Sequence, residues 1–151
     1  MKKNGIVSKI LIVVMTVMML ASAFTMVSSA SSTDRDFELV FYGNGTDYTG
    51  YASKDNGTDV YMKCESTRAG CAAWVKGSNY SYGYLDCSDG KHYYFTSNVA
   101  RFMYSNVYGR YLFARIDGSC SYTSSDSIAS GAWSPDSVYE NGVLPSYDYM
   151  K

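Results

Sequence analysis

The four cysteines of this chain, Cys64, Cys71, Cys87 and Cys120, are the residues whose chemistry is most restricted by number and spacing. In a small exported domain, an even number of cysteines predicts two disulfides, and four cysteines allow three connectivities. The local register favours Cys64–Cys71, which leaves Cys87–Cys120. No Cys-x-x-Cys spacing is present, so we expect neither a zinc site nor another metal site.

His92 is the only histidine, so any catalysis that needs an imidazole must use it. It follows a turn at residues 89–91, and no Gly-x-Ser-x-Gly or His-Glu-x-x-His pattern is present. Asp86, Ser88 and Asp89 do not have the spacing of a calcium loop. We therefore expect a surface histidine, no cofactor and no catalytic residue. A small secreted hydrolase with two catalytic acids stays open, because sequence does not show which carboxylates lie close in space.

Tyrosine is abundant, with sixteen residues in the chain. Tyr80, Tyr82 and Tyr84 alternate, so on a strand they would share one face. Together with Trp74 they are the candidate ligand-binding residues, because flat amphipathic rings suit the recognition of sugars and proteins. The same rings also cover the outer face of a sheet without any ligand, and this alternative stays open.

The stretch 59–76 would position several of these residues. If it folds as a hairpin in which Cys64 faces Cys71, then Val60 lies opposite Val75 and one face is wholly apolar. The remaining pairs of this register are Met62 with Ala73, Tyr61 with Trp74, Asp59 with Lys76, and Lys63 with Ala72. Aromatic and opposite-charge pairs of this kind stabilise an antiparallel pair.

Short apolar segments separated by turn residues make up the rest of the domain. Phe37, Leu39 and Phe41 share one face of a first strand, and residues 110–116 predict a central strand because their middle is apolar on both faces. Further strands are expected around residues 83–87, 93–96, 99–104 and 128–133, the last with Trp133 in the core. Seven to nine such strands predict an all-β fold, an antiparallel β-sandwich stapled by disulfides.

Residues 1–30 have the order of a secretory signal peptide: basic residues, an apolar run over residues 10–20, then small residues. Cleavage is expected after Ala30 or Ala23. The alternative is an uncleaved membrane anchor, but the apolar run is shorter than the roughly 20 residues that a bilayer requires. We therefore expect a secreted protein with no stable membrane anchor.

Cleavage after residue 30 divides the rest into a β-sandwich domain at 31–138 and a loosely ordered C-terminal tail at 139–151. Three of the thirteen basic residues and none of the fourteen acidic ones lie in the leader, which gives the mature chain a net charge of −4. A mildly acidic domain without a basic stripe argues against nucleic acid as a partner.

A resemblance appears near the C-terminus, in the segment Ser130-Gly-Ala-Trp-Ser-Pro-Asp-Ser-Val138. Together with the residues at 106–111 and 114–116, it resembles small exported proteins of unknown function from Gram-positive bacteria. The layout of signal, short β-rich domain and terminal tryptophan is also similar to that of lactococcin 972-type bacteriocins. Neither resemblance implies a catalytic residue.

These observations predict a secreted, non-catalytic β-sandwich that binds a partner at or beyond the cell envelope, such as a cell-wall glycan or an envelope protein. An antimicrobial protein that acts on the envelopes of competitors is the first alternative. The small hydrolase is the second.

Overall fold

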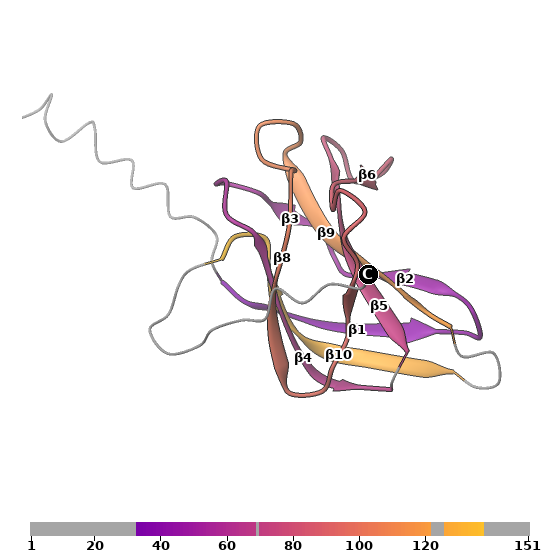
Figure 1. Cartoon of the computed structure of the whole chain (residues 1–151). Helices are drawn as coiled ribbons and strands as arrows, with labels where there is room; N and C mark the ends of the chain where they lie inside the picture. Colours follow the sequence, from indigo (N-terminus) through magenta and orange to yellow (C-terminus); the bar gives the residue numbers. More distant parts are fainter. Residues whose placement is uncertain (1–32, 69, 122–125, 138–151) are drawn as a thin grey trace, which may run out of the picture.

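The computed structural model describes residues 33–68, 70–121 and 126–137, and in this part of the chain all regular structure is β. Ten strands form two antiparallel sheets that pack together (Figure 1). The strands are β1 (Arg35–Phe41), β2 (Thr46–Tyr48), β3 (Ala52–Ser53), β4 (Val60–Thr67), β5 (Cys71–Ser78), β6 (Leu85–Asp86), β7 (Tyr93–Tyr94), β8 (Val99–Met103), β9 (Phe113–Cys120) and β10 (Ser127–Ser134). The predicted β-sandwich is confirmed.

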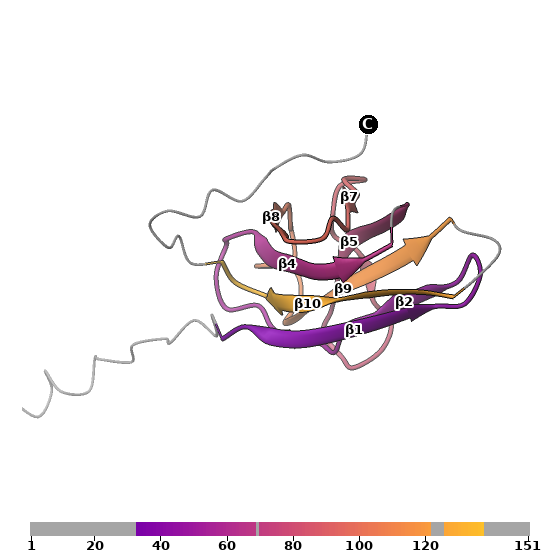
Figure 2. The ribbon, with the colours of Figure 1, turned by 90° about the horizontal axis from the view of Figure 1, so that it is seen from below.

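One sheet has the strand order β1-β10-β4-β8, and Figure 2 shows these strands side by side. The other has the order β2-β9-β5-β6, with β3 paired to β9 and β7 paired to β5. In Figure 1, β5 and β9 run across the direction of β1 and β10. Strand β9 is central, as predicted from the apolar residues at 110–116, although it begins only at Phe113.

The predicted hairpin over residues 59–76 is wrong. Strand β4 pairs with β10 and β8, whereas β5 pairs with β9, β6 and β7, so the two strands lie in different sheets. The predicted apolar face is nevertheless right, because Val60, Met62, Ala73 and Val75 are all fully buried. Alternation determines which residues enter the core, and two strands that face each other across a sandwich show the same alternation as two strands that pair.

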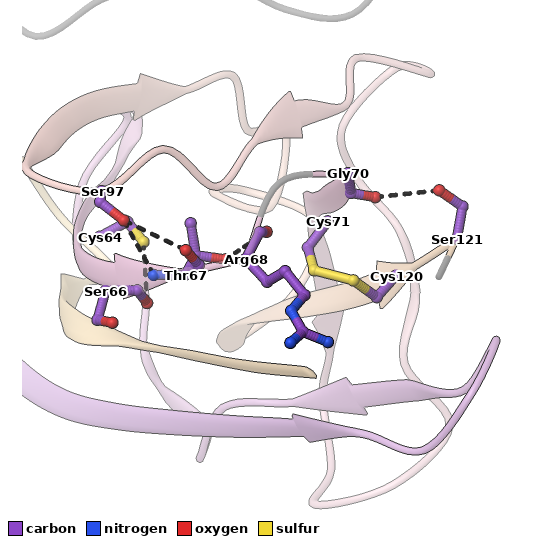
Figure 3. The surroundings of a disulfide bond; sticks show 9 residues. All are labelled: Cys64, Ser66, Thr67, Arg68, Gly70, Cys71, Ser97, Cys120 and Ser121. Carbon is purple, nitrogen blue, oxygen red and sulfur yellow. Dashed lines mark hydrogen bonds between the residues drawn. A yellow bond between two sulfur atoms is a disulfide. The ribbon is translucent and has the colours of Figure 1, made fainter. Parts of the chain in front are cut away.

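The predicted disulfides Cys64–Cys71 and Cys87–Cys120 are also wrong. Cys71 is bonded to Cys120, which is its register partner at the start of β5 and the end of β9 (Figure 3). Cys64 and Cys87 are buried free thiols. The error follows from the hairpin: once β5 pairs with β9 instead of β4, Cys71 lies beside Cys120 and Cys64 points into the core from the opposite sheet.

Large side chains from both sheets fill the core between them. Phe37, Leu39 and Phe41 enter it from β1, as their alternation predicted, and Trp133 enters from β10. Gly118 on β9 provides the space for them: a Cβ there would lie 2.9 Å from the Phe41 ring. A larger residue at this position would overpack the core.

The Ser-Pro-Asp segment that begins at the last residue of β10 holds the chain after β3. Asp136 and Lys54 form an ion pair, with Lys54 Nζ 2.7 Å from Asp136 Oδ1 and both side chains fully buried. The backbone N–H groups of Asp55 and Asn56 also donate to the Asp136 carboxylate. The C-terminal segment singled out by its resemblance therefore has a structural part in this fold.

The predicted signal peptide at 1–30 and the predicted tail at 139–151 lie outside the described residues, as does the end of the domain predicted at residue 138. Within the described ranges, no helix has the length and apolar character needed to cross a membrane.

Candidate functional site

Aromatic and charged side chains gather on the outward side of the sheet that contains β2, β9 and β5. Alternation separates this side from the core: Val75 and Ile116 point inward, so their neighbours Trp74 and Lys76 on β5, and Arg115 and Asp117 on β9, point outward. We call this surface the aromatic face. Its members are Tyr48, Tyr51, Trp74, Lys76, Tyr84, His92, Phe113, Arg115 and Asp117.

An ion cluster occupies the centre of the aromatic face. Arg115 donates to Asp117 through two nitrogens, Nε to Oδ1 at 2.6 Å and Nη2 to Oδ2 at 3.1 Å. Lys76 Nζ lies 2.9 Å from Asp117 Oδ2. A two-point Arg–carboxylate contact fixes both side chains more firmly than a single contact does. Asp117 is only 7% exposed, so its charge is held in place by two cations.

Two tyrosine rings enclose the guanidinium group of this cluster. The Arg115 guanidinium carbon lies 4.0 Å from the centre of the Tyr48 ring and 4.3 Å from that of Tyr84. A guanidinium within about 6 Å of a ring centre is attracted by the π-electrons. Arg115 therefore orders one ring from β2 and one from the segment that precedes β6.

Two further ring pairs extend the face in both directions. Trp74 stacks on His92 with centroids 4.8 Å apart, and Tyr51 meets Phe113 edge to face at 5.3 Å. Ring pairs in these geometries are stabilised beyond their burial by about 0.5–1.5 kcal/mol. The aromatic rings are thus held in fixed orientations rather than scattered over the surface.

The structure brings two of the four predicted ligand-binding residues, Trp74 and Tyr84, onto the aromatic face. Tyr80 and Tyr82 lie in a loop between β5 and β6, so the prediction that they share one face of a strand with Tyr84 is wrong. Their rings stack on each other at 5.5 Å and are 63% and 69% exposed.

Hydrogen bonds from Ser78 and to Asn79 fix the conformation of this loop, which covers residues 79–84. Ser78 Oγ donates to the Tyr82 carbonyl and accepts from the Tyr80 N–H, which replaces the strand's hydrogen bonds by a local turn. The Leu112 N–H donates to the Asn79 side chain, which ties the loop to the chain just before β9. The stacked tyrosine pair therefore stands at the end of the sheet that carries the aromatic face.

The hydroxyl group of Tyr84 is unusual because it is buried, although the residue belongs to the aromatic face. This hydroxyl has no hydrogen-bond partner among the described residues. Burial raises the pKa of this phenol, and the nearby Arg115 opposes that effect. An unmade hydrogen bond at a buried polar atom is costly, and the Tyr84 hydroxyl carries this cost beneath the aromatic face.

Sequence analysis did not identify Arg115, Asp117, Tyr48 or Tyr51 as parts of a site. The expected partner of Lys76 was Asp59, and the actual partner is Asp117. The only available signal was the Arg-x-Asp spacing in a predicted strand, which places both charges on one side. Neither that spacing nor the composition shows that β2 supplies a tyrosine above them.

The aromatic face contains no thiol, because both free cysteines lie in the core. The free thiols are buried, and burial raises the pKa of Cys64 to about 11 and also raises that of Cys87. No cluster of three or more His, Cys, Asp or Glu residues suited to a metal ion occurs in residues 33–68, 70–121 and 126–137. Flat rings with fixed charges between them suit contact with a ligand.

Residues 21–137 match the family model described as "Protein of unknown function (DUF2712)". This match covers both sheets and every residue of the aromatic face. No curated protein and no solved structure is significantly similar to the chain.

Proposed function

The chain belongs to the DUF2712 family, and from its aromatic face we propose that the protein is a non-catalytic binding module whose ligand is a cell-wall glycan. The proposal rests on the ordered side-chain cluster at the centre of that face. In this cluster, Arg115 lies between the rings of Tyr48 and Tyr84 and forms an ion pair with Asp117. This cluster holds its rings and charges in one orientation before any ligand binds. Such preorganisation lowers the entropic cost of binding.

The residue types on the face suit a sugar. A flat aromatic ring gives a large contact area against the C–H face of a pyranose, and it loses little side-chain entropy because only two torsions must be fixed. The Lys76 side chain is 26% exposed, so its amine can donate to sugar hydroxyls. A few well-placed polar groups among apolar ones are typical of ligand sites.

The proposal also requires export. A chain with the basic, apolar and small-residue order of residues 1–30 is expected to reach the outside of the cell, where a wall ligand is accessible. N-terminal sequencing of the protein from culture medium should begin near Ser31 or Phe24. A retained Met1 in that protein would contradict the proposed cleavage.

The direct test is retention on purified cell walls. We expect wild type to be retained and Trp74→Ala to be retained about tenfold less, because a stacked ring in an interface contributes roughly 1–2 kcal/mol. The matched control is Tyr42→Ala: Tyr42 is 72% exposed and follows β1, outside the aromatic face. Equal retention of the Trp74 and Tyr42 variants would contradict the assignment of the face.

The same assay separates the other functions. Retention of wild type on protein-containing envelopes but not on purified glycan would replace the glycan by an envelope protein. Killing of sensitive cells without any retention would favour the antimicrobial alternative. Release of soluble wall fragments by wild type, and its loss in His92→Ala, would identify a hydrolase.

A further inference from the structure

Lys54 and Asp136 form a buried ion pair that the proposed binding function does not use. Lys54 Nζ lies 2.7 Å from Asp136 Oδ1, and neither side chain is exposed to solvent. The two residues are 82 positions apart in the sequence, one just after β3 and the other just after β10. A buried ion pair carries a large desolvation cost.

We propose that Lys54 and Asp136 become joined by an amide bond between Nζ and Cγ in the folded protein. The neutral amine attacks the carbonyl carbon of the protonated carboxyl group, and the Nζ–Cγ bond forms. The Cγ–Oδ1 bond then breaks, and Oδ1 leaves as water with the carboxyl proton and one proton from the amine. One amine, one carboxylic acid, one amide and one water balance the reaction. No oxidant, reductant or other co-reactant is needed.

The required protonation states are close to those of the ion pair. Transfer of one proton from the ammonium to the carboxylate converts the charged pair into the neutral pair without exchange with solvent. Burial lowers the pKa of Lys54, while the hydrogen bond and the charge of Asp136 oppose that effect. Asp59 and Asp55 are the other charged groups that act on Lys54, and burial raises the pKa of Asp59.

The backbone places donors where charge develops during the attack. The Asp55 N–H donates to Asp136 Oδ2 at 3.0 Å, and Oδ2 is the oxygen that becomes negative in the tetrahedral intermediate. The Asn56 N–H donates to Oδ1 at 3.2 Å, on the oxygen that leaves. Fixed donors of this kind stabilise an oxyanion without reorganisation.

The position of the amine is fixed as well. Lys54 Nζ also donates to the Thr58 carbonyl, and Thr58 Oγ1 accepts from the N–H of Ser137, the residue after Asp136. The two partners are therefore held by one connected set of hydrogen bonds. Holding reactants in contact replaces a bimolecular encounter by an intramolecular step.

The experiment is mass spectrometry of the full exported chain after reduction of its disulfide. We expect the measured mass of the intact chain to be lower, by one water, than the mass calculated from the sequence that starts at its observed N-terminus. Proteolysis should yield a branched peptide that joins the Lys54 and Asp136 segments. The Lys54→Arg variant keeps the charge but should show the full mass and no branched peptide.

The control matters because Asp-Gly sequences lose one water when they form a succinimide, and this chain has them at Asp89-Gly90 and Asp117-Gly118. A deficit that persists in Lys54→Arg would assign the lost water to these sites and overturn the proposal. Recovery of separate, unmodified Lys54 and Asp136 peptides from wild type would overturn it too. That second readout needs no variant, so it holds even if Lys54→Arg does not fold.

Discussion

Gly131 lies so close to the backbone of Lys63 that a Cβ at position 131 would be 2.0 Å from the Lys63 carbonyl oxygen. The contact occurs where the register between β10 and β4 shifts, between Ser130 and Gly131. Such a bulge places one more residue on one strand than on its partner and brings the two backbones together. Glycine is therefore required by space at this position.

We expect Gly131→Ala to lower the free energy of unfolding by about 3 kcal/mol or more, at the upper end of overpacking effects, because the obstructing atom belongs to the backbone and cannot rotate away. Urea unfolding followed by circular dichroism measures this. Gly50→Ala is the control, since nothing lies within 4 Å of a Cβ at position 50. Equal midpoints for the two variants would show that the bulge is absent.

The Cys71–Cys120 bond gives a second expected outcome. It closes a loop with a sequence separation of 49. Its removal by Cys71→Ala and Cys120→Ala should lower the free energy of unfolding by roughly 3–4 kcal/mol, because the unfolded chain gains entropy. Non-reducing peptide mapping should recover Cys71 linked to Cys120. A linked peptide that contains Cys64 or Cys87 would contradict the structure.

The buried thiol of Cys64 should make the folded protein less stable at alkaline pH. Burial raises the pKa of its thiol from the ordinary value of 9.0 to about 11. Since the folded pKa lies above the unfolded one, this contribution is complete below pH 9 and is lost as pH rises toward 11, by an amount of about 2–3 kcal/mol. Unfolding free energies measured from pH 8 to pH 11 should therefore fall more steeply in wild type than in Cys64→Ala.

Cys87 and Tyr84, whose pKa values burial also raises, remain in both proteins of that comparison. The difference between the two slopes therefore reports Cys64 alone. Identical slopes would mean that the Cys64 thiol ionises in the folded state as it does in a peptide.

Most strands could be predicted because they carry a local signal, but the short strands β2 and β3 were not expected. Alternation placed Phe37, Leu39 and Phe41 in the core, and the apolar centre of residues 110–116 identified β9 as central. The pairing of β4 could not be predicted, because two strands that face across a core and two that hydrogen-bond have the same inward residues. The disulfides were wrong for the same reason, since their expected connectivity rested on that pairing.

The candidate site was only partly predictable. Trp74 and Tyr84 were named from their type, and they do lie on the aromatic face. Arg115 and Asp117 were not named, because their partners come from β2 and β5, which are distant in sequence. Side-chain contacts between non-adjacent strands depend on register, which the sequence pattern of a single strand does not contain.

Arg115 should stabilise the fold through the shape of its guanidinium group as well as through its charge. We expect Arg115→Lys to lower the free energy of unfolding by about 1–2 kcal/mol, because lysine cannot make the two-point contact with Asp117 or stack between the two tyrosines. Lys63→Ala is the comparison, since the Lys63–Glu65 pair is 3.8 Å apart and solvent-exposed, so its loss should cost less than about 1 kcal/mol. Thermal unfolding measures both effects. Equal losses of stability in Arg115→Lys and Lys63→Ala would show that the Arg115 cluster does not order the aromatic face.

The most direct test of the glycan-binding proposal uses the two tryptophans, since Trp133 is 1% exposed in the core and Trp74 lies on the aromatic face. In Trp133→Phe all tryptophan emission comes from Trp74, and in Trp74→Phe all of it comes from Trp133. Titration with solubilised cell-wall glycan fragments should shift or quench the emission of Trp133→Phe in a saturable way and leave that of Trp74→Phe unchanged. An unchanged spectrum in Trp133→Phe, with its fold intact, would contradict the proposal that this face binds cell-wall glycan.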